Sequence, residues 1–232
     1  VMCVAPNFWS GPGTVCVPSP CWASYPWCPQ GSLFEEEPTC QDGYIDSYNG
    51  GCNSTPVIWQ TLAAQPGGCA VMCGRSCTYL NYGTSTRDSD WYLSVGSGAT
   101  VTYTLTAYFP FMMALLTGTD CGDLVYTYYF GAADDTGTLT ATIAAGVDVG
   151  FFVANSSFSG YPMEAPYVMN VCGIREPPGA CCNASGACIV VAPDLCTSLG
   201  GVFQGNQTCV PNPCVPTPTE VKSWGAVKKL FR

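Results

Sequence analysis

Residues Thr100–Phe109 of this 232-residue chain read TVTYTLTAYF and give the clearest indication of its fold class. Threonine occupies every even position from 100 to 106, whereas the odd positions from 101 to 109 carry Val, Tyr, Leu, Ala and Phe. Side chains of a strand alternate between its two faces, so this period of two predicts a half-buried strand. One face belongs to a core, and the other is rich in threonine.

Similar segments lie on both sides of this strand. Residues 138–143 alternate Thr with Leu, Ala and Ile, and one side of another expected strand carries Leu124, Tyr126, Tyr128 and Phe130. Further apolar runs, separated by Gly, Asp, Asn and Pro, occupy residues 91–95, 111–116, 147–154 and 167–172. Seven or eight short strands at this spacing predict an all-β fold, an antiparallel β-sandwich or jelly-roll-like domain.

The composition changes along the chain and predicts four parts. Residues 1–34 form a loop-rich arm of Cys, Pro and Trp, and residues 35–176 form the sandwich. Residues 177–214 contain six cysteines and form a small disulfide unit. Residues 215–232 are a Pro-rich spacer and a basic tail, in which we expect a short C-terminal helix with an amphipathic face.

Composition also limits the classes of function. The chain has no His, which removes the most common general base, so we expect a non-catalytic protein rather than an enzyme. The carboxylate pairs Asp88/Asp90, Asp120/Asp123 and Asp134/Asp135 do not specify glycosidase geometry. A net charge of −9 argues against nucleic acid as a partner. The longest apolar stretch, residues 107–116, is too short for a transmembrane segment.

Seventeen cysteines predict disulfides and therefore an oxidising, extracellular environment, either secreted or at the cell surface. The chain begins at Val1 without a charged and apolar leader, so we expect any signal peptide to have been removed already. The odd number leaves at least one cysteine without an intrachain partner. The cysteines expected in disulfides are Cys3, Cys16, Cys21, Cys28, Cys40, Cys52, Cys69, Cys73, Cys172, Cys181, Cys182, Cys188, Cys196, Cys209 and Cys214.

Three blocks of sequence carry a resemblance to a known family. They are YNGGCNSTP at residues 48–56, CAVMCG at 69–74 and RDSDWY at 87–92. Across residues 38–173 the chain resembles bacterial secreted proteins with a sandwich similar to the bacterial pre-peptidase C-terminal domain. The resemblance implies a non-catalytic accessory domain. Residues 179–214 also resemble short Cys-rich repeats of similar bacterial proteins, and residues 223–232 resemble an ending found on exported ones.

One departure from that family pattern concerns the odd cysteine. After the C-G-x-S block, where such sandwiches carry a small residue, this chain has Cys77. We therefore expect Cys77 to be unpaired, with Cys121 as the rival, and a buried free thiol is the alternative reading of Cys77.

Calcium is the metal that the acidic residues suggest. Glu35, Glu36, Glu37, Asp42 and Asp46 gather oxygen ligands in one loop-rich stretch, and calcium prefers six to eight such oxygens. The expected ligands are Glu35, Glu36, Asp42, Asp46, Asp88 and Asp90. Two alternatives stay open: the acidic run is simply solvated, or Asp88 and Asp90 accept local backbone hydrogen bonds where a strand begins. No other cofactor is expected.

Two further sets of residues suggest exposed surfaces. The N-x-S/T pattern marks Asn53, Asn155, Asn183 and Asn206 as candidate glycosylation sites, although the pattern also arises by coincidence in a Ser/Thr-rich chain. Trp9, Trp22 and Trp27 of the arm could stack on sugar rings, but packing against protein is the more common role of such side chains.

The basic tail gives the functional hypothesis. Residues 1–219 hold 15 acidic and 3 basic side chains, whereas residues 220–232 hold 1 acidic and 4 basic ones. Opposite charges on one chain favour head-to-tail self-assembly, as in an extracellular filament or surface layer. A carbohydrate- or matrix-binding accessory module is the alternative, with a polysaccharide or the extracellular matrix as partner. The expected assembly residues are Trp224, Val227, Phe231, Lys228, Lys229 and Arg232.

Overall fold

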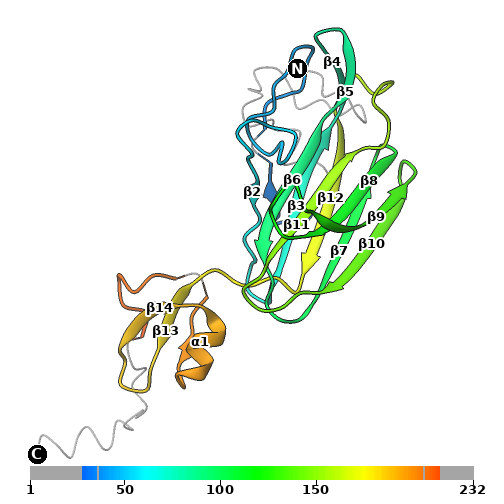
Figure 1. Cartoon of the computed structure of the whole chain (residues 1–232). Coiled ribbons are helices and arrows are strands. Elements are labelled where there is room, and N and C mark those ends of the chain that lie inside the picture. Colours follow the sequence, from blue (N-terminus) through cyan, green and yellow to red (C-terminus); the bar gives the residue numbers. More distant parts are fainter. Residues whose placement is uncertain (1–27, 36, 206, 215–232) are drawn as a thin grey trace, which may run out of the picture. The chain divides into compact units, whose positions relative to one another are not determined.

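The computed structural model describes residues 28–35, 37–205 and 207–214, and the chain divides into two compact units between Arg175 and Glu176 (Figure 1). Among the described residues of the larger unit, every regular element is a strand, which confirms the all-β prediction. Residues 1–27 of the N-terminal arm and the whole C-terminal spacer and tail, including the expected C-terminal helix, lie outside the described residues. Within the described part of the chain, no helix is long and apolar enough to span a membrane.

Two five-stranded sheets form the larger unit. The first has the order β1 (Leu33–Phe34), β3 (Cys69–Ser76), β12 (Ala165–Cys172), β7 (Thr100–Ala107) and β10 (Thr136–Thr142). The second has the order β2 (Gln60–Thr61), β6 (Ser89–Val95), β11 (Asp148–Asn155), β8 (Phe111–Thr117) and β9 (Val125–Gly131). Their pairing is antiparallel except for the two-residue strands β1 and β2, which lie parallel to β3 and β6. A separate hairpin joins β4 (Thr78–Asn81) to β5 (Thr84–Arg87).

The core between the two sheets follows the alternation that the sequence predicts. On β7, Val101, Tyr103 and Leu105 are fully buried, and the intervening threonines face outward. From the opposite sheet, Phe151 of β11 packs edge-on against Tyr103, with ring centroids 5.3 Å apart. The threonines of β7 pair with those of β10, and Thr106 and Thr136 share a 2.8 Å hydrogen bond. Burial of one face therefore fixes the register of both strands.

The second sheet also buries part of its outer face. Trp91 of β6, Phe152 of β11 and Ala114 and Leu116 of β8 form a second cluster, and the partly buried Trp59 packs edge-on against Trp91. Gly51 lies against Trp91 with a φ of +50°, a conformation that disfavours any side chain. The segment that carries Gly51 and Trp59 covers β6, β11 and β8, whereas residues 125–130 of β9 are all exposed.

The smaller unit has a three-stranded sheet of order β14 (Cys188–Val191), β13 (Gly179–Cys182) and β15 (Val202–Phe203), and one short helix, α1 (Pro193–Ser198). Three disulfides close it: Cys181–Cys196, Cys182–Cys214 and Cys188–Cys209. Pro193 begins α1, where the missing N–H of proline costs nothing. A unit with so few buried side chains depends on its cross-links for stability.

Four more disulfides lie in the larger unit: Cys28–Cys73, Cys40–Cys77, Cys52–Cys121 and Cys69–Cys172. The prediction that Cys77 or Cys121 is unpaired is therefore wrong. Cys77 is fully buried beside the loop that carries Cys40, and Cys121 lies in the β8–β9 turn, where Cys52 reaches it. Spacing along the sequence does not reveal these contacts, because the partners are 37 and 69 residues apart. The remaining Cys3, Cys16 and Cys21 lie outside the described residues.

Candidate metal centre

A group of buried carboxylates lies where the loop after β1 packs against the start of β6. The loop contributes Glu35, Glu37 and Asp46, β6 contributes Asp90, and Asp88 directly precedes β6. The oxygens form two overlapping groups, Glu35/Glu37/Asp90 and Glu37/Asp46/Asp88, and within each group they lie within 4.8 Å of one another. Glu37 belongs to both groups, so its carboxylate could bridge two ions.

Glu35 is the best satisfied of the five. Its Oε1 accepts a 2.7 Å hydrogen bond from the backbone N–H of Arg75, and its Oε2 accepts a 3.2 Å hydrogen bond from the Tyr167 hydroxyl. The Arg75 guanidinium lies 3.6 Å from Glu35 and also pairs with Glu164. The single positive charge of Arg75 is therefore shared between Glu35 of the cluster and Glu164 outside it, and it does not neutralise the five carboxylates of the cluster.

The loop between Glu37 and Asn49 is shaped by its own polar contacts. Glu37 Oε1 accepts a hydrogen bond from the Tyr44 hydroxyl, and Asp46 Oδ1 accepts from the N–H groups of Tyr48 and Asn49. The Asn49 side chain, fully buried, donates from Nδ2 to Asp90 Oδ1 at 3.0 Å. These bonds position one polar atom of each side chain and leave one carboxylate or amide oxygen of each without a partner.

Five of these available oxygens are buried and have no hydrogen-bond partner. Asp90 and Asn49 are 0% exposed, Asp88 is 4% exposed and Glu37 is 6% exposed. A buried polar atom without a partner costs about 1–3 kcal/mol, and more when it carries charge. Five such atoms in one place are an arrangement that a bound cation would satisfy. They are Glu37 Oε2, Asp46 Oδ2, Asn49 Oδ1, Asp88 Oδ1 and Asp90 Oδ2.

Burial dominates the electrostatics of the cluster. It raises the pKa of Glu35, Asp88 and Asp90 well above the ordinary range of a carboxyl group, and the neighbouring carboxylates raise it further. Burial also raises the pKa of Glu37 and of Asp46. The pKa of Tyr79 rises to about 12, first through burial and then through the charges of the cluster. Without a cation, the site opposes ionisation of its own carboxyl groups.

The donor set fits calcium. Every candidate ligand is a carboxylate or amide oxygen, the chain has no His, and Cys40 and Cys77 are joined in a disulfide. Hard, oxygen-only sites with several carboxylates favour Ca²⁺, which accepts six to eight ligands in flexible geometry. An ion here would connect the loop of residues 35–49 to β6. Its role would be structural, because the ligands are buried.

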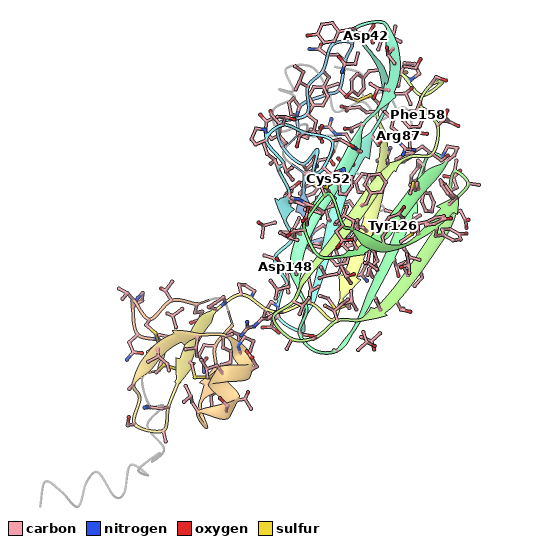
Figure 2. All side chains as sticks on the ribbon, viewed as in Figure 1. Asp42, Cys52, Arg87, Tyr126, Asp148 and Phe158 are labelled. Carbon is pink, nitrogen blue, oxygen red and sulfur yellow. A yellow bond between two sulfur atoms is a disulfide. The ribbon has the colours of Figure 1, made fainter. Side chains whose placement is uncertain are left out.

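The sequence located part of this centre. Glu35, Asp46, Asp88 and Asp90 are brought together, whereas Asp42 lies apart at the β4 end (Figure 2), where its side chain accepts a hydrogen bond from the Leu80 N–H. Glu36 lies outside the described residues. The local-bond alternative for Asp88 and Asp90 does not account for their partnerless oxygens.

Asn49 was missed, and Glu37, although part of the acidic run, was left out of the expected ligand set. A usable signal for Glu37 was present, because residues i and i+2 of an extended segment share a face, and Glu35/Glu37 and Asp88/Asp90 both have that spacing. No such signal marks Asn49.

The other candidate site residues are not brought to this centre. Asp120, Asp123, Asp134 and Asp135 are exposed residues of the turns on either side of β9. Of the glycosylation candidates, Asn53 and Asn183 are exposed, and Asn206 lies outside the described residues. Asn155 is 0% exposed and accepts from the Ser157 N–H, so burial corrects the prediction of a glycan there. The tail residues expected in assembly also lie outside the described part.

A second feature of the surface is a row of aromatic side chains on β9. Tyr126, Tyr128 and Phe130 are 54%, 57% and 55% exposed, and neighbouring ring centroids lie 6.2 Å and 5.6 Å apart. Each lies opposite an outward-facing residue of β8 at the margin of the second cluster. Figure 2 shows Tyr126 on the β9 side of the sandwich, away from Asp42. We call these three side chains the aromatic row.

Comparisons with known proteins give little. No protein-family model matches the chain, and no curated protein matches it. Among solved structures, the chain is similar to PliG of Aeromonas hydrophila, a periplasmic inhibitor of g-type lysozyme, with 14% sequence identity and a TM-score of 0.33. The similarity covers 49% of this chain and 95% of PliG. At that TM-score it assigns neither fold nor function to this chain.

Proposed function

We propose that this chain is a non-catalytic structural protein of the extracellular space, which binds calcium and assembles with copies of itself as a filament or surface-layer subunit. Seven disulfides among the described residues indicate folding in an oxidising compartment. The convergence of five buried, partnerless oxygens carries the calcium part of the proposal. Calcium at millimolar concentration is available outside cells, where structural sites of modest affinity are filled.

The same burial supports a structural rather than a catalytic role. Asp88 and Asp90 have almost no exposed surface, so a substrate cannot reach them. The exposed carboxylate pairs lie in turns, where Asp120 accepts from the Gly122 N–H and Asp135 accepts from the Tyr129 hydroxyl. These contacts explain the carboxylates without any acid–base chemistry.

Self-assembly is supported by charge and by the aromatic row. The body of the chain is strongly acidic and the last thirteen residues are basic, which favours head-to-tail contacts. Three half-exposed aromatic rings on an edge strand form an apolar surface of roughly 300 Å², a size that is often functional in soluble proteins.

Electron microscopy and sedimentation velocity of the purified chain test the proposal, in calcium and in chelator. We expect filaments or sheets, or at least concentration-dependent association in sedimentation, and calcium binding by calorimetry. A chain that stays monomeric at every concentration would refute the assembly part. A chain that binds no calcium would refute the metal part.

A carbohydrate- or matrix-binding accessory module is the second candidate. The aromatic row supports it, because exposed rings in a row can stack on sugar faces, and the resemblance to pre-peptidase C-terminal sandwiches suits such a role. Pull-down with insoluble polysaccharides and with matrix proteins tests it. Retention that disappears in the Tyr128→Thr variant would favour this candidate over self-assembly.

A further inference from the structure

We infer that the aromatic row on β9 is the docking site for the basic C-terminal segment, residues 220–232, of a second copy of the chain. This inference rests on the proposed self-assembly and names the two surfaces that would meet. The first is the row of Tyr126, Tyr128 and Phe130, and the second contains Trp224, Val227 and Phe231.

The row has the properties of a surface that lacks its cover. On the outer face of the second sheet, the segment around Trp59 covers the apolar side chains of β6, β11 and β8. The disulfide between Cys52 and Cys121 ties this segment to the β8–β9 turn. The cover ends there, and the apolar face continues onto β9 as exposed rings. A second apolar element laid over β9 would complete the layer.

Charge identifies the C-terminal segment as the occupant. Asp120 and Asp123 precede β9, Asp134 and Asp135 follow it, and all four are exposed. The three basic residues among the described ones are all arginines, and none belongs to β9 or its flanking turns. The acidic turns at the two ends of β9 are therefore complementary in charge to a segment with four basic residues and one acidic residue. An acidic surface of another copy would instead be repelled.

Pattern and length agree with this occupant. Trp224, Val227 and Phe231 have the i, i+3 and i+7 spacing of one helical face. From residue 224 to residue 231 a helix rises about 11 Å, and from Tyr126 to Phe130 a strand rises roughly 13 Å. The two apolar rows are therefore of matching length. In such a helix, Lys228 would border the apolar face, and Lys228 and Arg232 would reach the aspartates at the ends of β9.

Docking between copies gives a heterologous contact, because the row and the segment are different surfaces of one chain. Such a contact repeats from copy to copy and forms an open filament when the rotation does not close. The apolar side chains would supply most of the binding energy, and the exposed charges would orient the contact and increase the rate of association.

Complementation between two full-length variants tests the inference. The row variant carries Tyr126→Thr and Tyr128→Thr, which remove the rings and keep a residue that favours strands. The tail variant carries Trp224→Ala and Phe231→Ala. The matched control is Tyr82→Asn, which removes an exposed ring from the β4–β5 turn, where Asn tolerates the φ of +48°. All four proteins, wild type included, are compared by sedimentation velocity, and thermal melting confirms that each variant is folded.

We expect the wild type and the control to associate, and each of the two variants alone to associate at least tenfold more weakly. An equal mixture of the two variants should form one-to-one complexes, because the mixture contains one intact row and one intact tail. If the tail instead docked on its own chain, the substitutions would not weaken association between copies, and mixing the two variants would not form one-to-one complexes.

Three outcomes would overturn the inference. A row variant that assembles as well as the wild type would show that the row has another occupant, and self-assembly itself would still stand. A mixture that fails to form complexes would exclude the pairing of row and tail. A wild type that remains monomeric would remove the proposed assembly together with this inference.

Discussion

Substitution of Asp90 by Asn separates a metal site from a merely buried carboxylate. The amide side chain would keep an oxygen to accept the hydrogen bond from Asn49 and would occupy the same volume, so the change removes charge and a ligand with little change of packing. In calcium, we expect the variant to lose most of its calcium-dependent stabilisation. In chelator, we expect it to be at least as stable as the wild type, because a buried, desolvated charge has been removed.

The size of the effect follows from mass action. An ion that binds only the folded state stabilises it by about 2.7 kcal/mol when its concentration is 100 times the dissociation constant. For a domain of this size, one kcal/mol moves the melting temperature by roughly 2–4 °C. The wild type should therefore melt roughly 5–10 °C higher in saturating calcium than in chelator, and Asp90→Asn should show little of this shift.

Calorimetry of calcium binding and differential scanning calorimetry measure both quantities. Asp148→Asn is the matched control, since Asp148 is an exposed carboxylate at the start of β11 (Figure 2), remote in the chain from the cluster ligands. The control should keep the full calcium shift. Equal melting temperatures of the wild type in calcium and in chelator would refute the reasoning, as would equal calcium shifts in Asp90→Asn and Asp148→Asn.

Protonation of the cluster, the disulfide pairing and one glycine give three further predictions. Because the pKa values of the cluster are raised, the metal-free folded state binds more protons than the unfolded state, and its free energy of unfolding should fall as pH rises above the ordinary carboxyl pKa of about 4. Urea unfolding at pH 5 and pH 8 in calcium-depleted buffer should show this fall, and added calcium should diminish it. A free energy of unfolding that rises with pH would contradict the electrostatics. Non-reducing peptide mapping should find the seven described disulfides, and alkylation should locate the odd cysteine among Cys3, Cys16 and Cys21; a labelled Cys77 would contradict the pairing. Gly51→Ala should destabilise the sandwich by about 2–4 kcal/mol in thermal unfolding, because the new methyl group meets the Trp91 side chain at a positive φ. In the control Gly43→Ala the methyl group meets nothing, so only the backbone strain of about 1 kcal/mol should be lost. Equal losses of stability in the two variants would refute the steric argument.

The residues alone predicted the all-β class and the strands β6 to β12, but not β3, which lies within the first sheet. The alternation along residues 100–109 is a local property, and a strand that buries one face must alternate in this way, so β7 and its partner β10 could be predicted from the residues alone. The cysteine content likewise predicted disulfides, and the acidic residues suggested calcium.

Tertiary structure decided which of these residues meet. Glu35 and Asp90 are 55 positions apart in the chain, and Asp42, though nearer to Glu35, faces another way. The partners of Cys77 and Cys121, the burial of Asn155 and the exposure of Tyr128 depend on which loop covers which sheet face. Which loop covers which sheet face depends on packing between segments that are far apart in the sequence, and such contacts have no periodic sequence pattern from which to predict them. Periodicity determines the face on which a side chain lies, and only the folded chain determines what lies against that face.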